Sequence, residues 1–216
     1  DGIRDSVAAR GLGDVYKRQM AASEEILAAS DLEATGIWLW GQGTQPQVPS
    51  FSETHQVSAG LVTAVDLVRG IGRLTGVEVC DIPGATGWYD TDYEGKRDVA
   101  LRELAAGADL FIIHVEATDE AGHAGDVAAK VEALENWDRR IIADLIPGLD
   151  NLGPWRLLML PDHATPLTTR THTGDPVPYL LVDSQADGTG GSFTERGVRE
   201  TPVIAGHKLM PRLLTG

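Results

Sequence analysis

Residues 109–146, "DLFIIHVEATDEAGHAGDVAAKVEALENWDRRIIADLI", contain the unit that decides the fold. The apolar run "DLFIIHV" predicts a buried strand, and "GDVAAKVEALENWDRRIIADLI" predicts a long helix. One face of this helix should pack inward, because apolar residues recur along it at helical spacing. They are Val127, Val131, Leu134, Ile141 and Leu145.

The same alternation of strand and helix patterns continues on both sides of this unit. Further strands are predicted for "IWLW" (37–40), "GLVTAV" (60–65), "VEVCDI" (77–82), "WRLLML" (155–160) and "VPYLLV" (177–182). Further helices are predicted for 20–30, 66–76 and 94–108, with a last one at 206–214 broken near Pro211. Strands separated by helices form βαβ units, so we expect an α/β fold in which one mainly parallel sheet has helices on both faces.

Composition excludes several classes of partner. The 216 residues, 42% of them hydrophobic, can bury a sizeable core. With 18 Lys and Arg against 32 Asp and Glu, the net charge of -14 would repel the phosphates of a nucleic acid. No apolar run approaches the ~20 residues that a membrane helix needs. A single cysteine, Cys80, cannot form an internal disulfide, so a reducing, cytoplasmic location is expected.

Ionisable residues gather where predicted strands end, and ligands of open α/β sheets bind beyond the carboxyl ends of the strands. Asp119 and His123 follow the first quoted strand, Asp162 and His163 follow "WRLLML", and His172 precedes "VPYLLV". Carboxylates and imidazoles without a thiolate suit Mn²⁺, Zn²⁺, Co²⁺ or Mg²⁺. Two such ions ~3.5–4 Å apart can clamp the attacking and leaving oxygens of a phosphoryl transfer.

Each cluster also has a purely structural interpretation. Asp119 could cap a turn, His123 could be a surface histidine, and Asp162 could cap a helix N-terminus. His172 alone carries little information. The coincidence of all three clusters at strand ends is what favours a shared metal site.

Six motifs in their order strongly resemble the archaeal-type, cofactor-independent phosphoglycerate mutases of the alkaline phosphatase superfamily. They are "IWLWGQG", "VDLVRGIGRLTGVEV", "PGATGWYDTDYEGK", "HVEATDEAGHAGD", "LPDHATP" and "RTHTGDPVPYLL", within residues 36–210. The resemblance implies an alkaline phosphatase-like fold and an isomerase of glycolysis and gluconeogenesis. It also implies that two divalent ions, often Mn²⁺, flank a phosphorylated serine while 3-phosphoglycerate and 2-phosphoglycerate interconvert.

The resemblance also implies roles for individual residues. Asp119, His123 and His172 would hold one ion, and Asp162 with His163 would hold part of the other.

Lys96 of "TDYEGK" would contact the transferring phosphoryl group. An ammonium at a helix N-terminus suits an anion, although a solvated lysine is the simpler interpretation from the residues alone. Arg170 is a weaker candidate for binding substrate. His114 and Glu116 lie beside the metal motif and could orient ligands by hydrogen bonds.

One departure from the family concerns the N-terminal side. Members carry an aspartate ligand and the nucleophilic serine in an N-terminal segment, which also supplies the first strand of the sheet. We find no such segment here, so the chain is expected to be the C-terminal half, to contain no nucleophile, and to need its missing half for activity. Residues 20–35 would be the tail of the inserted substrate-binding lobe, and 36–216 the C-terminal part of the metal-binding domain.

Residues 1–19 resemble translated sequencing-adaptor text and are expected to be non-native, although an amphipathic helix is an alternative interpretation. Two alternative functions also stay open. One is a phosphatase, phosphodiesterase or phosphonate hydrolase with the same metal ligands, and the other is a non-catalytic, metal-binding half-domain. The sequence does not predict the oligomeric state.

Overall fold

The computed structural model describes residues 7–39, 43–44, 46–188 and 190–215. The chain divides into two compact units, residues 1–47 and 48–216. The first contains helix α1 (Val7–Ala28), which includes most of the helix predicted at 20–30 and runs across the predicted boundary at residue 19. The origin assigned to residues 1–19 stays a prediction.

The strand predicted for "IWLW" is wrong over residues 37–39, which have no regular structure. Trp38 is 81% exposed. A strand needs a neighbour for its backbone N–H and C=O groups, and no strand in the described part of the chain pairs with this segment. Trp40 lies outside the described residues.

A parallel sheet forms the centre of the second unit, which confirms the predicted α/β class. Its strands are β1 (Ala59–Val62), β2 (Glu78–Cys80) and β3 (Leu110–Ile113), in the order β2-β1-β3. All pairs are parallel. Helix α3 (Asp66–Leu74) connects β1 to β2, and α4 (Tyr93–Ala105) connects β2 to β3, as parallel pairing requires.

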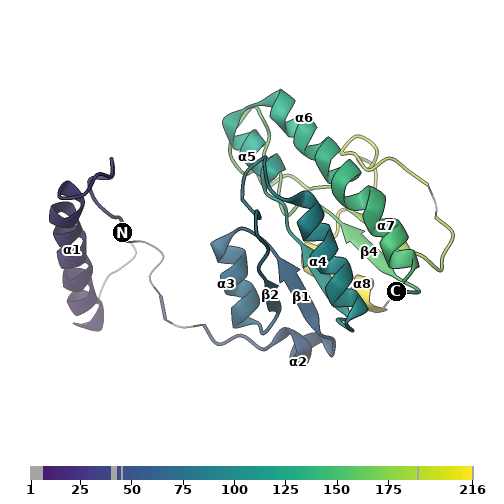
Figure 1. The fold of residues 1–216 in the computed structure, drawn as a ribbon, viewed down its shortest axis with the longest axis horizontal. Helices are drawn as coiled ribbons and strands as arrows, with labels where there is room; N and C mark the ends of the chain where they lie inside the picture. Colours follow the sequence, from purple (N-terminus) through teal and green to yellow (C-terminus); the bar gives the residue numbers. More distant parts are fainter. Residues whose placement is uncertain (1–6, 40–42, 45, 189, 216) are drawn as a thin grey trace. The chain divides into compact units, whose positions relative to one another are not determined.

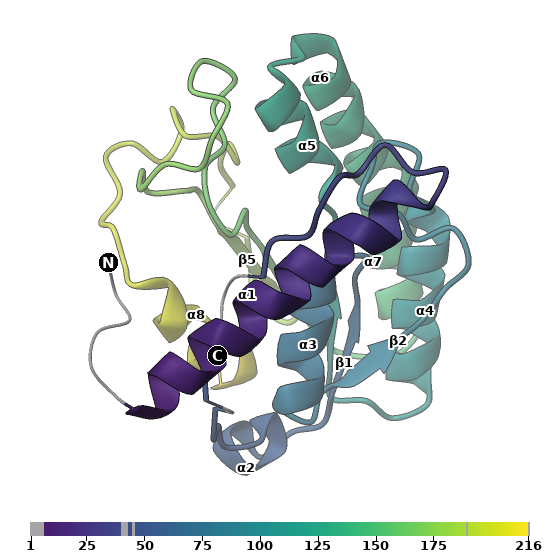
Figure 2. The ribbon, with the colours of Figure 1, turned by 90° about the vertical axis from the view of Figure 1, so that its left-hand side faces the viewer.

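Helices cover both faces of this sheet, as predicted (Figure 1, Figure 2). Side chains alternate between the faces of a strand. On one face, a methyl group placed on Gly72 of α3 would lie 3.0 Å from Leu61 and 2.9 Å from Val79. On the other, Glu103 of α4 and Cys80 of β2 line one hollow. Therefore α3 and α4 lie on opposite faces.

The two remaining strands do not join this sheet, so the expected single sheet is wrong in this respect. β4 (Arg156–Met159) and β5 (Leu180–Asp183) pair antiparallel in a sheet of their own. Parallel neighbours need a crossover, usually a helix. Residues 160–179 between the two strands contain no helix, and the chain returns antiparallel.

The long predicted helix is present but changes register inside. It comprises α6 (Val127–Asn136), a π-helical segment η1 (Trp137–Ile142) and α7 (Ala143–Asp150). Of the predicted packing face, Ile141 and Leu145 are buried, whereas the residues of α6 are exposed: Val127, Val131 and Leu134. A π segment has more residues per turn than an α-helix and rotates the inward face. Of the residues of α6, Ala133 belongs to the hydrophobic core, and Asn136 is also buried.

Short helices complete the second unit. α2 (Phe51–His55) precedes β1, and η2 (Gly206–Lys208) leads into α8 (Leu209–Thr215) near the C-terminus. The predicted break at Pro211 is wrong, because Pro211 lies in the first turn of α8, where a helix needs no N–H from it. Among the described residues, no helix has both the length and the hydrophobicity of a membrane span.

Candidate metal centre

Helix α5 (Ala117–Ala124) follows β3 and carries two of the candidate ligands. Asp119 and His123 are four residues apart and therefore share a helix face. The small residues Ala121 and Gly122 are buried and pack the helix on the body of the protein. We did not predict this helix, although the spacing of the two ligands and the Gly125 that ends it, with φ 70°, both indicate it.

The side chain of His172 approaches this pair. The Nε2 atoms of His123 and His172 are 3.0 Å apart. His123 Nε2 lies 3.3 Å from Asp119 Oδ2, and His172 Nε2 lies 3.5 Å from Asp119 Oδ1. Ligand atoms around one tetrahedral ion with bonds of ~2.0–2.1 Å are roughly 3.3–3.5 Å apart. The spacing of the three groups fits a shared ion.

The pair that follows β4 lies in the same cluster. The rings of His163 and His172 stack with 3.7 Å between their centroids. Three ligand atoms lie within 4.8 Å of one another, one each from Asp119, His163 and His172. Asp162 Oδ2 lies 3.4 Å from His163 Nε2, and the Asp162 side chain is 69% exposed. Because His163 belongs to the same group of ligand atoms as Asp119, the assignment of His163 and Asp162 to a separate ion stays a prediction.

The hydrogen bond of His123 favours metal binding. Its Nδ1 lies 3.0 Å from the carbonyl oxygen of Arg170. A carbonyl can only accept, so Nδ1 carries the hydrogen, and a neutral ring then has a free lone pair at Nε2. That lone pair faces Asp119 and His172. A histidine oriented in this way by a backbone carbonyl is a usual metal ligand, so these residues fit a divalent ion.

Arg170 contributes to the centre through its backbone. It has a left-handed φ of 53°, and its carbonyl accepts from His123. Its side chain is exposed, and the guanidinium lies against Gly125, where a Cβ atom would overlap it. The predicted role of Arg170 in substrate binding stays a prediction.

Lys96 is fully buried, with a relative exposure of 0%. Its Nζ donates to the carbonyl oxygen of His114 over 2.8 Å. Burial lowers the pKa of Lys96, while the nearby charges of Glu116 and Asp92 oppose that shift. A phosphoryl oxygen can reach this ammonium only if neighbouring side chains move, so the predicted contact with the phosphoryl group stays a prediction.

His114 and Glu116 form a half-buried layer beside the ligands. His114 Nδ1 lies 2.9 Å from Thr63 Oγ1, and burial lowers the pKa of His114. Burial raises the pKa of Glu116. A methyl group on Gly87 would lie 2.6 Å from the Glu116 carboxylate, so a glycine makes room for it. Both shifts favour uncharged groups next to the cluster.

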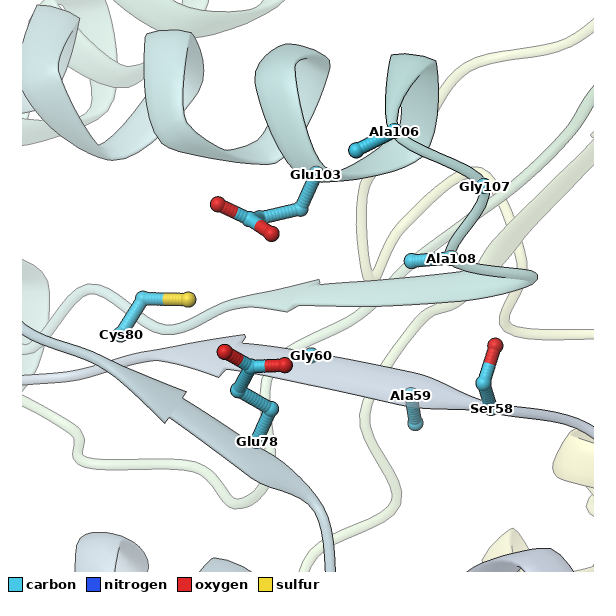
Figure 3. A pocket seen from close by; sticks show the side chains of 9 residues that line it. All are labelled: Ser58, Ala59, Gly60, Glu78, Cys80, Glu103, Ala106, Gly107 and Ala108. Atoms are coloured by element: carbon cyan, nitrogen blue, oxygen red, sulfur yellow. The ribbon is translucent and has the colours of Figure 1, made fainter.

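A separate hollow lies at the amino ends of the parallel strands, opposite to the metal cluster. Figure 3 shows Glu78, Glu103 and Cys80 on its walls. Burial raises the pKa of the Cys80 thiol, and both glutamates raise it further. The thiol therefore stays protonated, and two carboxylates disfavour an anionic ligand. We therefore do not assign an anion-binding site to this hollow.

Comparison with known proteins identifies the family. A model described as the metalloenzyme superfamily matches residues 12–211. The chain belongs to this superfamily. It is 40% identical, over 87% of its length, to a probable 2,3-bisphosphoglycerate-independent phosphoglycerate mutase of Geobacter sulfurreducens. It is 47% identical, over 70% of its length, to the 2,3-bisphosphoglycerate-independent phosphoglycerate mutase of Methanothrix thermoacetophila.

The fold comparison agrees with the sequence comparison. A solved protein of Pyrococcus horikoshii, PH0037, superposes on 96% of the present chain, with a TM-score of 0.79 and 27% identity. These matches confirm the resemblance to the mutases. The chain spans only 48% and 38% of the Geobacter and Methanothrix relatives and 57% of the Pyrococcus chain.

Proposed function

We propose that this chain is the C-terminal part of a cofactor-independent phosphoglycerate mutase, an isomerase that interconverts 3-phosphoglycerate and 2-phosphoglycerate. The observation that carries the proposal is the convergence of three histidines and one aspartate on α5 and the loop after β4. They are Asp119, His123, His163 and His172. The chain that holds them is 40% identical to a relative named as such a mutase.

The cluster would hold two divalent ions, for which we propose Mn²⁺, with Zn²⁺, Co²⁺ and Mg²⁺ as alternatives. Asp119, His123 and His172 would bind one ion, and Asp162 with His163 would provide part of the second site. When bound, such ions neutralise charge on a phosphoryl group and activate an oxygen nucleophile. The chain has a net charge of -14, so cations are also what would make an anionic substrate acceptable here.

The residues of this chain would orient these ligands. The Arg170 carbonyl holds the His123 ring by its Nδ1 hydrogen. Lys96 donates a hydrogen bond to the carbonyl oxygen of His114, which lies between β3 and α5. This bond would keep Asp119 in place relative to the sheet. We propose this orienting role of Lys96 alongside the phosphoryl contact that the resemblance implies.

The phosphoserine mechanism needs a nucleophile, and the resemblance implies that this serine belongs to a segment N-terminal to the residues present here. Curated relatives are about twice as long as the matched part. A nucleophile must hold the phosphoryl group between its two transfers. We therefore propose that the 216 residues alone are inactive and need the missing N-terminal half, in a cytoplasmic enzyme of glycolysis and gluconeogenesis.

An enolase-coupled assay tests this function. The 216-residue chain and an intact protein that contains this sequence are each supplied with 3-phosphoglycerate and Mn²⁺. We expect 2-phosphoglycerate from the intact protein, no turnover by the chain alone, and turnover by the chain once its N-terminal half is added in trans. Release of inorganic phosphate without 2-phosphoglycerate would instead establish a hydrolase, and full turnover by the isolated chain would disprove the need for a second half.

A further inference from the structure

Thr165 lies in the loop after β4 and has only 6% of its surface exposed. Its hydroxyl meets two of the candidate ligands at once. Thr165 Oγ1 donates to Asp119 Oδ1. The same oxygen lies 3.2 Å from His163 Nδ1. One hydroxyl group thus connects a ligand on α5 with a ligand that follows β4.

The directions of these two hydrogen bonds follow from the chemistry of the groups. An ionised carboxylate can only accept, so the hydroxyl hydrogen of Thr165 points to Asp119. Only lone pairs of Oγ1 then remain for His163, so His163 Nδ1 must carry a hydrogen. A neutral imidazole has one N–H. Its Nε2 is therefore left with a free lone pair, as a metal ligand requires.

Thr165 is anchored by contacts that involve no ion. Lys130 Nζ of α6 donates to the Thr165 carbonyl oxygen over 2.7 Å. Gly122 of α5 allows close approach, because a methyl group there would lie 2.6 Å from that oxygen and 2.9 Å from Thr165 Cγ2. The neighbouring Ala164 carbonyl accepts from the N–H of Thr173, next to His172. These contacts fix the backbone at Thr165 and thereby position its hydroxyl.

We propose that Thr165 is a positioning residue that fixes the Asp119 carboxylate and selects the Nδ1–H tautomer of His163, and so couples the two groups of metal ligands. This inference rests on the metal centre proposed above. Thr165 itself does not bind the ion. Hydrogen-bonded partners of this kind orient ligands, and their loss commonly weakens metal binding ~10–100-fold.

The tautomer is measured without any metal. Long-range ¹H–¹⁵N NMR of the imidazoles is recorded in EDTA at about pH 8, above the usual histidine pKa of ~6.5, with His163→Gln used to assign the resonance. We expect Nδ1–H for His163 in the wild type and in Thr165→Ser, which keeps the hydroxyl. Thr165→Val keeps the shape but loses the hydroxyl and should lose this preference. His123, held by Arg170, should keep its tautomer in every variant.

Calorimetric titration with Mn²⁺ gives the second measurement. Thr165→Val should bind ~10–100-fold more weakly than the wild type, whereas Thr165→Ser and the exposed control Thr168→Val should bind like the wild type. Equal affinity of Thr165→Val and wild type, or an Nε2–H tautomer of His163 in the wild type, would overturn the proposal. If Thr165→Val does not fold, the tautomer of His163 in the wild type tests the proposal. If the wild type binds no Mn²⁺, the proposed metal centre is wrong, and the tautomer of His163 still tests the role of Thr165.

Discussion

His114 directly follows β3 and is harder to protonate than an ordinary histidine. Burial lowers its pKa, and the charge of Asp162 only partly opposes this. As pH falls below the usual value of ~6.5, the unfolded chain therefore binds a proton at this residue before the folded chain does. The contribution of His114 to stability is complete above that pH and is lost as pH falls toward its folded pKa.

Replacing His114 by Asn tests this prediction, because the Asn side chain has both a donor and an acceptor with which to hydrogen-bond Thr63. Urea unfolding is followed in EDTA at about pH 8 and about pH 5.5, on either side of the usual histidine pKa. We expect the free energy of unfolding to fall less between these pH values in His114→Asn than in the wild type. An equal fall in both proteins would show that His114 titrates alike in the folded and unfolded states.

The candidate ligands could be predicted as residue types at strand ends, since the carboxyl end of a parallel sheet is where ligands gather. The structure brings Asp119, His123, His163 and His172 together. Thr165 could not be predicted. Its contacts depend on a loop that folds back onto α5, and a short polar residue in a loop gives no sign of such a long-range contact.

At the scale of elements, the π segment η1 decides which leucines of the long helix are buried. Leu145 of α7 is 4% exposed, whereas Leu134 of α6 is 56% exposed. Leu145→Ala should lower the free energy of unfolding by ~2–5 kcal/mol, because it leaves a cavity in the core. Leu134→Ala should change it by no more than ~0.5 kcal/mol. Chemical denaturation of both variants measures this, and equal losses would mean that the helix keeps one inward face throughout.

Helix α5 and the loop after β4 approach so closely that only glycine fits at residue 122. Gly122→Ala would place a methyl group 2.6 Å from the Thr165 carbonyl, and such overpacking costs ~1–3 kcal/mol. The matched control is Gly70→Ala in α3, where a methyl group meets nothing within 4 Å and should stabilise the helix by ~0.5–1 kcal/mol. Thermal unfolding compares the two, and a stabilising Gly122→Ala would disprove the close contact.

Most elements could be predicted because their patterns are local. The runs that form β1, β2 and β3 are apolar and bounded by helical patterns. The direction of β5 and the exposure of residues 37–39 depend on which backbones pair, and that information is not local. The π segment could not be predicted for a different reason: its sequence, "WDRRII", has an ordinary helical composition.

At the scale of the whole molecule, the fold brings ligands from distant parts of the chain to one place. Asp119 and His123 come from α5, while His163 and His172 come from the stretch between β4 and β5. In the sequence, α5 precedes the long helix, and the stretch between β4 and β5 follows it. Metal binding by this chain therefore requires the second unit to be folded, and the central claim is that its folded form holds a divalent ion.

The metal content of the 216-residue chain tests that claim most directly. The wild type, His172→Ala and His55→Ala are dialysed against Mn²⁺, and bound metal is measured by elemental analysis. His55 is a suitable control, because it lies in α2, where its ring packs on Phe51 with 4.6 Å between the ring centroids. We predict bound Mn²⁺ in the wild type and in His55→Ala, and loss of one ion in His172→Ala. A metal content in folded His172→Ala equal to that of the wild type would contradict the account.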